Sequence, residues 1–571
     1  MSERLYKYLE ITDLKDMLNK TNKLYGDKTA YKIRIEDQKY KTFTHAEVRN
    51  MIDAIGTSLI SMGLKNKRIA VIGENRYEWE IAYLSIVCGT GIVVPIDKAL
   101  PKNELRDVIE RGEVEAIFCS GKYVEMLKEI KSETTGNLKY IISMDLEKSK
   151  DGIFSEQELI ETGKTLLQNG DRSFIDAEIN PEEMSIMLFT SGTTSKSKVV
   201  ALSHKNICTN LMDIGSTLDV NSDDVILSVL PIHHVFECTV GFLFALYKGA
   251  QTVFCDGIRH IVKNLNEYHV SVMACVPAIY ERIFKNIRKE LEKQGKLEEI
   301  LKKEEEYKNA TMQDKKEVFK EIHNMLGGNI RLFISGAAAL DKTIEERYRL
   351  LGLNLVQGYG LTETSPVVGI GSKKYHKIGS IGKTVPSVTA KVVNKNSEGI
   401  GELIVKGPSI MLGYFGDEKA TKEAIKDGWF YTGDLARIDE EGYIFICGRK
   451  KSVIVLKNGK NIYPEEMENL VNQIEGVKES FIFGKQKSND KEDVKINVKI
   501  VFDRERVKKI YQANDDQEIH DALLNKVKEI NKTMPPYKAI RGLIISEEPL
   551  IKTTTNKIKR QANLDLIEKQ L

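Results

Sequence analysis

Short apolar runs alternate with segments of helical periodicity over most of the chain. In the first part, apolar runs of strand length lie at 69–72, 92–95, 116–119 and 140–143. Segments with apolar residues at helical spacing, such as 79–87, separate these runs. The same alternation returns later, with runs at 186–189, 225–230, 252–255, 272–276, 330–334 and 353–356. This pattern is typical of parallel sheets covered by helices, so we predict an α/β fold with two α/β layered subdomains.

Two later stretches depart from this pattern. Residues 285–325 are dense in lysine and glutamate and carry one apolar helical stripe, which predicts a charged helical hairpin. From about residue 385, compact strands are separated by glycines, which indicates a small β-rich subdomain at about 385–448.

A further α/β segment follows a Gly-Arg-Lys-Lys turn after residue 447. We therefore predict a large N-terminal domain of residues 1–448 and a small α+β C-terminal domain of residues 449–571. Helices are expected at 464–474 and 516–531, with strands at 452–456, around 480–483 and at 494–501.

Composition and charge exclude several classes of protein. The hydrophobic fraction of 41% and charged fraction of 29% are ordinary for a soluble globular protein. The net charge of +2 gives no reason to expect a nucleic-acid partner. Seven cysteines without a CxxC pair fit reduced thiols in the cytosol. No apolar run reaches the ~18 residues of a membrane span, and the N-terminus lacks the apolar core of a signal peptide. We expect a cytoplasmic protein without a transmembrane segment; peripheral membrane contact and oligomeric state stay open.

A hydroxyl-rich loop follows the apolar run at 186–189. Gly192 allows a tight bend, and four hydroxyl side chains lie beside successive backbone N–H groups, those of Thr190, Ser191, Thr193 and Thr194. Such a concave loop suits an anion, with Lys196 or Lys198 as the countercharge. The alternative is a polar surface loop. The stretch is not a Walker A loop, because no Gly-Lys-Ser/Thr closes it.

The stretch 357–366 places a candidate ligand site directly after the run at 353–356. Glycines on both sides of Tyr359, one of them Gly360, let backbone approach a ligand while the ring offers a stacking face. Glu363 lies among hydroxyls and suits a cation that keeps several waters, such as Mg²⁺. A turn capped by Thr362 and Glu363 is an equally good interpretation.

A second stretch of small residues, 335–339, also follows a predicted strand. It includes Gly336 and Ala337, whose size would let a flat ring lie on the backbone. Open α/β sheets bind ligands at the carboxyl ends of their strands, where both stretches lie.

Six motifs in order resemble the adenylate-forming superfamily, which includes acyl-CoA synthetases, luciferases and the adenylation domains of peptide synthetases. They lie at 190–198, 230–237, 357–366, 431–434, 448–449 and 555–560. The resemblance extends from about residue 14 to residue 560. It implies a reaction in two halves: a carboxylate and ATP give acyl-AMP and pyrophosphate, and a thiol such as CoA then displaces AMP.

The resemblance implies roles for individual residues around ATP. The loop at 190–198, including the catalytic Thr193, would hold the β- and γ-phosphates. Tyr359 would pack on adenine, and Glu363 would bind Mg²⁺. Asp434 would accept hydrogen bonds from both ribose hydroxyls, with Arg449 close to the ribose and phosphate.

The resemblance also implies a mobile C-terminal domain that swings about Lys451. Lys557 would bridge the α-phosphate and the attacking carboxylate in the first half-reaction. The swing would withdraw Lys557 and bring in the turn at 457–461, where Gly459 lets the pantetheine arm of CoA pass. His234 would lie at the acyl site, although a structural histidine is the alternative.

The chain departs from the family pattern at the phosphate loop, where Ser195, Ser197 and Val199 replace glycine, proline and glycine. A serine at a position that needs φ > 0 costs roughly 1 kcal/mol or more, so the affinity for pyrophosphate could differ. Val455 also replaces a lysine that is frequent in relatives, so no second catalytic cation is assumed there.

Three stretches resemble the long-chain fatty acid branch of the superfamily: 74–79, 276–281 with the charged insertion, and 553–560. They favour a long-chain fatty acid–CoA ligase. Three alternatives remain: a fatty acyl-AMP ligase that loads a carrier protein, a non-catalytic acyl- or nucleotide-binding pseudoenzyme, and a P-loop phosphotransferase. The retained Glu363, Asp434, Arg449 and Lys557 argue against the pseudoenzyme, and the missing Walker A pattern argues against the phosphotransferase.

Overall fold

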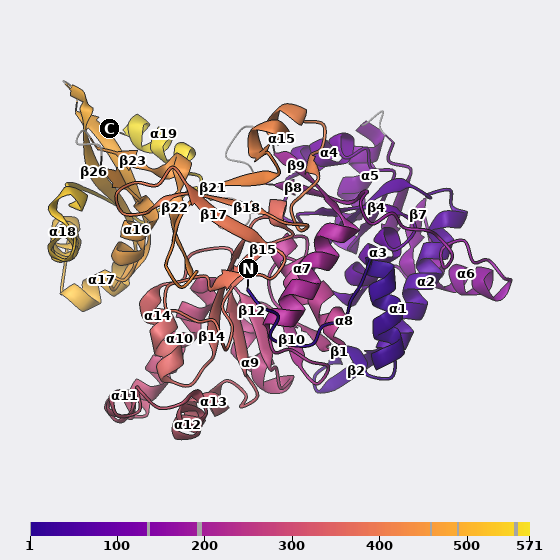
Figure 1. Ribbon diagram of the computed structural model, residues 1–571, viewed down its shortest axis with the longest axis horizontal. Helices are drawn as coiled ribbons and strands as arrows, with labels where there is room; N and C mark the ends of the chain where they lie inside the picture. Colours follow the sequence, from indigo (N-terminus) through magenta and orange to yellow (C-terminus); the bar gives the residue numbers. More distant parts are fainter. Residues whose placement is uncertain are drawn as a thin grey trace.

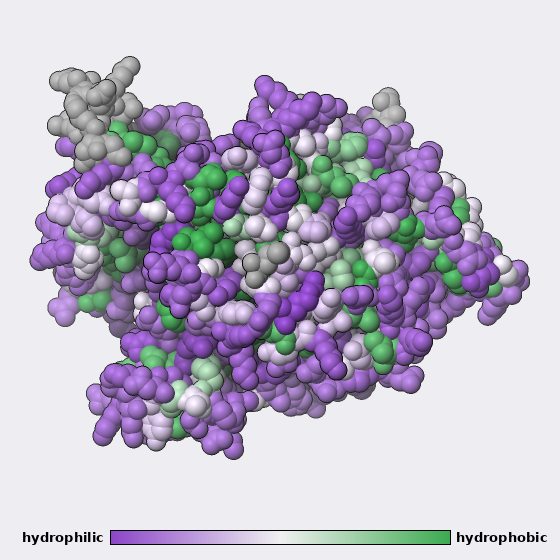
Figure 2. Space-filling view, viewed as in Figure 1, coloured by the Kyte–Doolittle hydropathy of each residue, from purple (hydrophilic) through white to green (hydrophobic). Residues whose placement is uncertain are grey.

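Two large sheets with helices packed against them form the main body of the molecule (Figure 1). The structure is a computed structural model that describes residues 2–133, 137–190, 197–456, 460–487, 490–552 and 558–570. The C-terminal segment lies at one end of the long axis and helix α6 (Glu156–Gln168) at the other (Figure 1). The face seen in Figure 2 is mainly hydrophilic, with hydrophobic residues gathered in smaller areas.

The first sheet has eight strands within the described residues, in the order β19-β9-β8-β4-β3-β5-β6-β7. The strands from β8 to β7 in this order run parallel, whereas β9 and β19 pair antiparallel. Their bounds are β3 (Lys67–Ile72), β4 (Gly91–Ile96), β5 (Ala116–Cys119), β6 (Tyr140–Ser143), β7 (Ile153–Ser155), β8 (Met184–Thr190), β9 (Lys198–Ser203) and β19 (Gly413–Tyr414). The helices that connect or cover them include α2 (His45–Ser61), α3 (Tyr77–Val87), α4 (Lys102–Arg111), α5 (Val124–Glu133) and α7 (His204–Thr217).

The second sheet has nine strands in the described part of the chain, in the order β16-β15-β14-β13-β12-β10-β11-β1-β2. The N-terminal hairpin of β1 and β2 joins strands that come some two hundred residues later, because β1 pairs in parallel with β11. The bounds are β1 (Thr29–Glu36), β2 (Lys39–Thr44), β10 (Val225–Ser228), β11 (Gln251–Phe254), β12 (Val272–Cys275), β13 (Leu332–Ser335), β14 (Leu355–Gly360), β15 (Val367–Ile370) and β16 (Lys383–Thr384).

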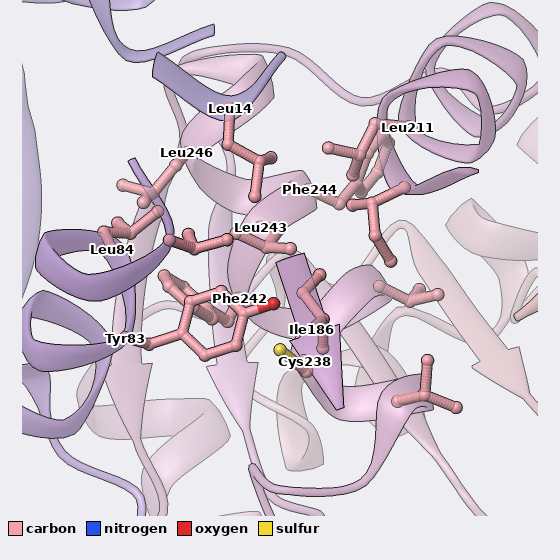
Figure 3. Close-up of a cluster of buried hydrophobic side chains, with 14 of the residues drawn as sticks. Leu14, Tyr83, Leu84, Ile186, Leu211, Cys238, Phe242, Leu243, Phe244 and Leu246 are labelled. Atoms are coloured by element: carbon pink, nitrogen blue, oxygen red, sulfur yellow. The ribbon is translucent and has the colours of Figure 1, made fainter. Parts of the chain in front are cut away.

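A large apolar core joins the two sheets (Figure 3). In this core, helix α3 packs against the π-helix η2 (Glu237–Leu243), which continues into α8 (Phe244–Lys248). The Tyr83 ring lies 5.6 Å from those of Trp79 and Phe242, stacked on the first and edge-on to the second. Helix α1 (Leu14–Tyr25) closes the cluster through Leu14, which is fully buried. Aromatic pairs of this geometry add to the free energy of burial.

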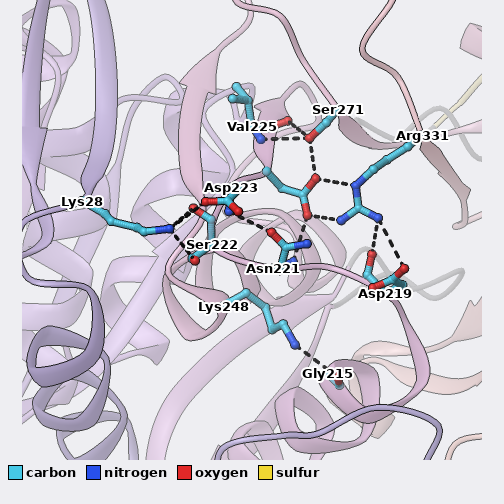
Figure 4. Close-up of polar contacts among 11 residues, drawn as sticks. Lys28, Gly215, Asp219, Asn221, Ser222, Asp223, Val225, Lys248, Ser271 and Arg331 are labelled. Atoms are coloured by element: carbon cyan, nitrogen blue, oxygen red, sulfur yellow. Dashed lines mark hydrogen bonds and ion pairs between the residues drawn. The ribbon is translucent and has the colours of Figure 1, made fainter.

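A polar cluster fixes the start of β10 against β12 and β13 (Figure 4). Arg331 donates from Nε to Asp224 at 2.6 Å and from Nη1 to the Asp219 carbonyl at 2.5 Å. The Ser271 hydroxyl donates to Asp224 at 2.7 Å. Asp224 is almost fully buried, so these donors compensate for the cost of removing its charge from water.

The segment 285–325 is helical as predicted, but the prediction of a hairpin was wrong. It contributes to four helices in the described residues: α10 (Pro277–Lys293), α11 (Leu297–Glu306), α12 (Met312–Val318) and α13 (Lys320–Met325). The apolar stripe of Ile283, Ile287 and Leu291 is buried in the core of the second sheet. Short turns break the charged sequence because each helix must return its apolar face to that core.

The β-rich subdomain is an antiparallel sheet of β17 (Thr389–Val393), β18 (Gly401–Lys406), β20 (Ile425–Lys426), β21 (Trp429–Ile438) and β22 (Ile444–Arg449). After Arg449 come a 3-10 turn, Lys450–Ser452, and a short strand pair, β23 (Ile454–Val455) and β24 (Asn461–Ile462). The C-terminal segment then has the strand order β25-β26-β27. Its elements are α16 (Pro464–Asn472), β25 (Val477–Lys487), β26 (Asp490–Phe502), α17 (Arg504–Tyr511), α18 (Asp516–Thr533), β27 (Gly542–Ser546) and α19 (Arg560–Gln570). Figure 1 shows this segment beside the β-rich sheet.

Within the described residues no helix is both long and apolar enough to cross a bilayer. All seven cysteines are free thiols, and five of them are buried. Buried cysteines of this kind behave as small hydrophobic residues.

Buried His204 predicts that the protein loses stability in mild acid. Its Nδ1 accepts the Leu14 N–H at 3.1 Å, so Nε2 carries the proton and donates to the Val87 carbonyl at 3.1 Å. Burial lowers the pKa of His204 to about 4, against about 6.5 in an unfolded chain. Between these pH values the unfolded chain binds a proton that the folded chain does not, so the free energy of unfolding should fall as the pH drops from about 6.5 to about 4. The loss from this one group approaches about 3 kcal/mol.

Urea denaturation at a series of pH values measures this effect. His204→Gln should flatten the pH dependence in that window, whereas the same change at the exposed His260 should not. An unchanged slope in His204→Gln would show that the imidazole is not the titrating group.

Candidate functional site

The predicted anion loop connects two antiparallel strands at the carboxyl end of β8. Thr190 ends β8 directly opposite Lys198, which begins β9, and the Thr190 hydroxyl donates to the Lys198 carbonyl at 3.2 Å. The residues between them that were predicted to bind phosphate, Ser191, Gly192, Thr193 and Thr194, lie outside the described residues, as does Ser195. The two ends of the loop are therefore fixed by a strand pair.

Ser197, which departs from the family pattern, is held by an arginine of helix α4. Arg111 donates from Nη2 to the Ser197 carbonyl at 2.7 Å and from Nη1 to its hydroxyl at 3.1 Å. The guanidinium also lies over the Phe189 ring, 5.4 Å from its centroid. Arg111 thus clamps the far end of the loop, and the serine hydroxyl adds a contact that proline could not make.

Lys198 and Glu363 come together at Tyr414. The Lys198 ammonium lies 4.2 Å from the centre of the Tyr414 ring, a cation–π contact. The Tyr414 hydroxyl donates to Glu363 Oε1 at 2.9 Å. Burial raises the pKa of Tyr414, so the hydroxyl keeps its proton and remains a donor. One tyrosine therefore orients both the cation of the loop and the carboxylate predicted to bind metal.

Glu363 is the carboxylate predicted to bind a metal at this place. Among the described residues no group of three or more histidine, cysteine, aspartate or glutamate side chains could hold a metal ion. A single carboxylate fits Mg²⁺, which retains waters and is usually bound by one or two carboxylates together with substrate phosphates. It does not fit a structural zinc site, which needs four ligands.

Tyr359, Asp434 and Arg449 form a second group, predicted from motifs far apart in the sequence. The Tyr359 hydroxyl donates to Asp434 Oδ2 at 2.5 Å, and Arg449 Nε donates to Oδ1 at 2.7 Å. Asp434 and Arg449 lie opposite each other on β21 and β22. Burial and the Asp434 carboxylate raise the pKa of Tyr359. Each carboxylate oxygen has two lone pairs, so Asp434 can still accept hydrogen bonds from a diol.

The turn that carries Glu363 requires a glycine at position 360. A Cβ on Gly360 would lie 1.8 Å from the Pro366 carbonyl oxygen, which no side chain can tolerate. Thr362 begins a 3-10 turn, Thr362–Thr364, and the Met411 N–H donates to the Glu363 carbonyl at 2.9 Å. Residues 362–364 thus form a turn, as the alternative interpretation predicted, and the Glu363 side chain still reaches Tyr414.

The small residues after β13 lie against the segment that carries the paired histidines. A Cβ on Gly336 would lie 2.8 Å from the Phe236 ring, and Ala337 has a left-handed φ of 67°. The His234 Nδ1 accepts the Phe236 N–H at 3.3 Å, which places the ring proton on Nε2. The stretches 335–339 and 230–237 therefore meet at Phe236.

Several contacts of the site were not predicted from the sequence. Tyr414 and Arg111 belong to none of the six motifs, and no sequence signal marks them. Two further predicted residues, Lys557 and Gly459, also lie outside the described residues. Their roles stay predictions, as do the roles of the residues that the structure does place.

Two families match the chain in sequence. Residues 18–415 match the AMP-binding enzyme family, and residues 451–571 match the C-terminal domain of AMP-binding enzymes. The chain is similar to a long-chain-fatty-acid–CoA ligase of Escherichia coli O6:H1, with 28% identity over 518 residues and 85% of each chain covered. It is also similar to long-chain-fatty-acid–CoA ligase FadD15 of Mycobacterium bovis, 28% identical over 76% of this chain and 74% of that protein. Human long-chain-fatty-acid–CoA ligase 1 is 27% identical over 84% of this chain and 73% of that protein.

Solved structures of other enzymes share the fold. ATP-bound MatB from Rhodopseudomonas palustris aligns with a TM-score of 0.75 and 23% identity, covering 98% of this chain and 99% of that one. The anthranilate CoA ligase AuaEII with anthranoyl-AMP aligns at 0.76 with 18% identity, covering 100% and 99%. MenE from Bacillus subtilis with its acyl-adenylate aligns at 0.73 with 20% identity, covering 95% and 97%. The predicted α/β fold, with a large N-terminal and a smaller C-terminal domain, is confirmed.

Proposed function

The chain belongs to the AMP-binding enzyme family of adenylate-forming acid–CoA ligases, and we propose that its substrates are long-chain fatty acids, ATP and CoA. The observation that carries this proposal is that motifs far apart in the sequence form two groups, Lys198 with Glu363 at Tyr414, and Tyr359 with Arg449 at Asp434. The choice of a long-chain acid is supported by similar proteins of bacteria and humans that are named long-chain-fatty-acid–CoA ligases.

In the first half-reaction, the proposed site binds and orients ATP for attack by a fatty acid carboxylate. Asp434 accepts the ribose hydroxyls, Arg449 lies near the ribose and α-phosphate, and Tyr359 packs on adenine, near Gly336 and Ala337. Lys198 and the loop hydroxyls bind the leaving pyrophosphate. Glu363 would hold Mg²⁺, which would supply positive charge for the phosphates. These groups place fixed charges and donors where negative charge develops in the transition state.

We also propose that residues 449–571 turn about Lys451 between the half-reactions. The 3-10 turn Lys450–Ser452 directly after β22 supports a hinge at this point, as does the start of the second family match at residue 451. In the first position Lys557 contacts the α-phosphate, and in the second Gly459 lies along the pantetheine arm of CoA. The location would be cytoplasmic, as the reduced cysteines suggest.

Pyrophosphate release from ATP and Mg²⁺, measured across carboxylic acids from acetate to long saturated and unsaturated chains, tests the proposal. Release that peaks at long chains and is accelerated by CoA is expected. Release without acceleration by CoA would favour transfer to a carrier protein. No release with any acid would favour the pseudoenzyme.

Tyr359→Phe is expected to raise the KM for ATP by about threefold to tenfold. The change removes one hydrogen bond to a buried carboxylate, worth about 1 kcal/mol, but keeps the ring against adenine. The KM for the fatty acid should stay within about twofold of the wild-type value. Initial rates of pyrophosphate release against ATP concentration measure the effect, and an unchanged KM for ATP would show that the hydroxyl does not orient the ribose acceptor.

A further inference from the structure

The segment that contains the adjacent His233 and His234 is held by the side chains of two residues, Asn75 and Glu237, that lie outside it. Neither residue has a role in the proposed chemistry. This segment, residues 229–236, leaves the carboxyl end of β10 in the second sheet and is called the His segment below. It leads directly into η2, a π-helix, and such helices are frequent at functional sites. The resemblance to the superfamily assigns His234 to the acyl site, and Phe236, two residues further along, lies against Gly336.

Asn75 reaches the His segment from the first sheet. It lies three residues beyond the end of β3, and its Nδ2 donates to the Ser228 hydroxyl at 2.9 Å and to the Leu230 carbonyl at 2.6 Å. Its Oδ1 accepts the Ile232 N–H at 3.2 Å. Both donors and the acceptor of one amide thus satisfy three groups spaced along the segment. No other side chain of similar size offers two donors and an acceptor in this geometry.

Glu237 holds the same segment from its other end. Its Oε1 accepts the Ser228 hydroxyl at 2.7 Å and its Oε2 accepts the Leu230 N–H at 3.3 Å. The side chain folds back along η2, where a Cβ on Gly241 would lie 2.6 Å from Oε1. Glu237 is 1% exposed, so its carboxyl group meets these donors in place of water. The Ser228 hydroxyl accepts from Asn75 and donates to Glu237, which joins the two into one chain of hydrogen bonds.

A third contact comes from the residue directly after β4 of the first sheet, since Asp97 Oδ2 lies 3.7 Å from His233 Nε2. The carboxyl ends of β3, β4 and β10 therefore meet around the His segment, in the position where open α/β sheets place ligands. Within the described residues, the hydrogen bonds of Asn75 and Glu237 run to residues 228, 230 and 232. They do not run to Tyr359 or Asp434.

We propose that Asn75 and Glu237, linked through Ser228, are positioning residues that set the shape of the acyl site by fixing the His segment. This inference rests on the proposed function, because it takes His234 and Phe236 as part of the acyl site. It implies that a substitution that loosens the His segment weakens binding of the acyl chain but not binding of ATP. Tyr359, Asp434 and Arg449 keep their geometry in such a variant.

Asn75→Asp tests the inference with almost no change of volume. It keeps an acceptor for the Ile232 N–H but removes both donors, and it brings a second carboxylate close to Glu237. The KM for palmitate should rise about tenfold or more, as expected for the loss of one or two buried hydrogen bonds, while the KM for ATP stays within about twofold. Amide hydrogen exchange in peptides covering 228–238 should become faster. Ser228→Ala, the milder variant, should shift both readouts in the same direction by a smaller factor.

Asn266→Asp is the matched control. Its Nδ2 also donates to two backbone carbonyls, those of Val262 and Met325, but Asn266 is exposed on helix α9 (Ile261–Glu267). It should leave both KM values and the exchange of 228–238 unchanged. Equal rises in the two KM values of Asn75→Asp, or unchanged exchange in 228–238, would overturn the inference. If wild-type protein releases no pyrophosphate with any acid, the proposed function fails, and the exchange of 228–238 alone decides whether Asn75 holds the His segment.

Discussion

Replacing Lys557 with alanine is expected to slow acyl-adenylate formation by about 10²- to 10³-fold while leaving thioester formation from supplied acyl-AMP within about twofold of wild type. Two anions, the carboxylate and the α-phosphate, must approach each other in the first half-reaction. A cation between them offsets their repulsion only in that step, because acyl-AMP already contains the new bond. Pyrophosphate release measures the first half-reaction, and consumption of CoA with synthetic acyl-AMP measures the second.

Lys559→Ala provides the control for this result. Lys559 is exposed and lies two residues further along, so its loss removes the same charge from the same segment without removing the proposed catalytic group. Both half-reactions should be nearly unaffected. An equal loss of both half-reactions in Lys557→Ala would contradict the role assigned to Lys557 and would indicate a general effect on the C-terminal domain.

The strands of the fold could be predicted because each is a short buried run with a sharp end. The runs at 116–119 and 140–143 are strands with these same limits, β5 and β6. The run at 353–356 was misplaced, since β14 extends through Tyr359 to Gly360. Glycine and tyrosine there carry no apolar signal, and the strand continues because β15 pairs with it. Pairing partners, such as β11 for the N-terminal hairpin, are set by tertiary packing and leave no local pattern.

The sequence indicated candidate site residues, but not the side chains, such as Tyr414 and Arg111, that contact and orient them. Tyr359, Asp434 and Arg449 were found as separate motifs, and the structure joins them through one carboxylate. The pairing of β21 with β22 places Asp434 opposite Arg449, and Tyr359 reaches them from β14 of another sheet, so their convergence could not be read from spacing. Asn75 appeared in the sequence as part of a stretch typical of the fatty acid branch, without a physical role. In the structure Asn75 holds residues 230 and 232 through hydrogen bonds, which gives this position a structural role.

Tyr414 shows why residues that only orient the predicted site residues cannot be found from the sequence. It stands in a turn-rich stretch and makes its two important contacts through opposite parts of one side chain, the ring with Lys198 and the hydroxyl with Glu363. Neither contact depends on a residue nearby in sequence. Such a residue is found only when β19 is known to pair with β9, which brings Tyr414 beside Val200 and Lys198.

Glu363→Gln is expected to lower pyrophosphate release by about 10²-fold at low Mg²⁺ and to raise the Mg²⁺ concentration needed for half-maximal rate. The amide keeps the size of the side chain and can still accept from Tyr414, but it removes the negative charge that a hard cation prefers. Thioester formation from supplied acyl-AMP should stay close to wild type, since pyrophosphate has already left. Initial rates over a Mg²⁺ series at fixed ATP measure the shift.

In the same assay, Tyr414→Phe distinguishes the effect of the Glu363 carboxylate from that of the hydrogen bond that orients it. It removes the hydrogen bond to Glu363 Oε1 but keeps the carboxylate and the ring under Lys198, so the rate should fall only severalfold, by the worth of about one hydrogen bond. A Mg²⁺ dependence in Glu363→Gln identical to that of wild type would show that the carboxylate does not bind the metal. In that case Glu363 would act mainly through the 3-10 turn that it shares with Thr362 and Thr364, and the charge for the phosphates would have to come from Lys198 and the loop that it closes.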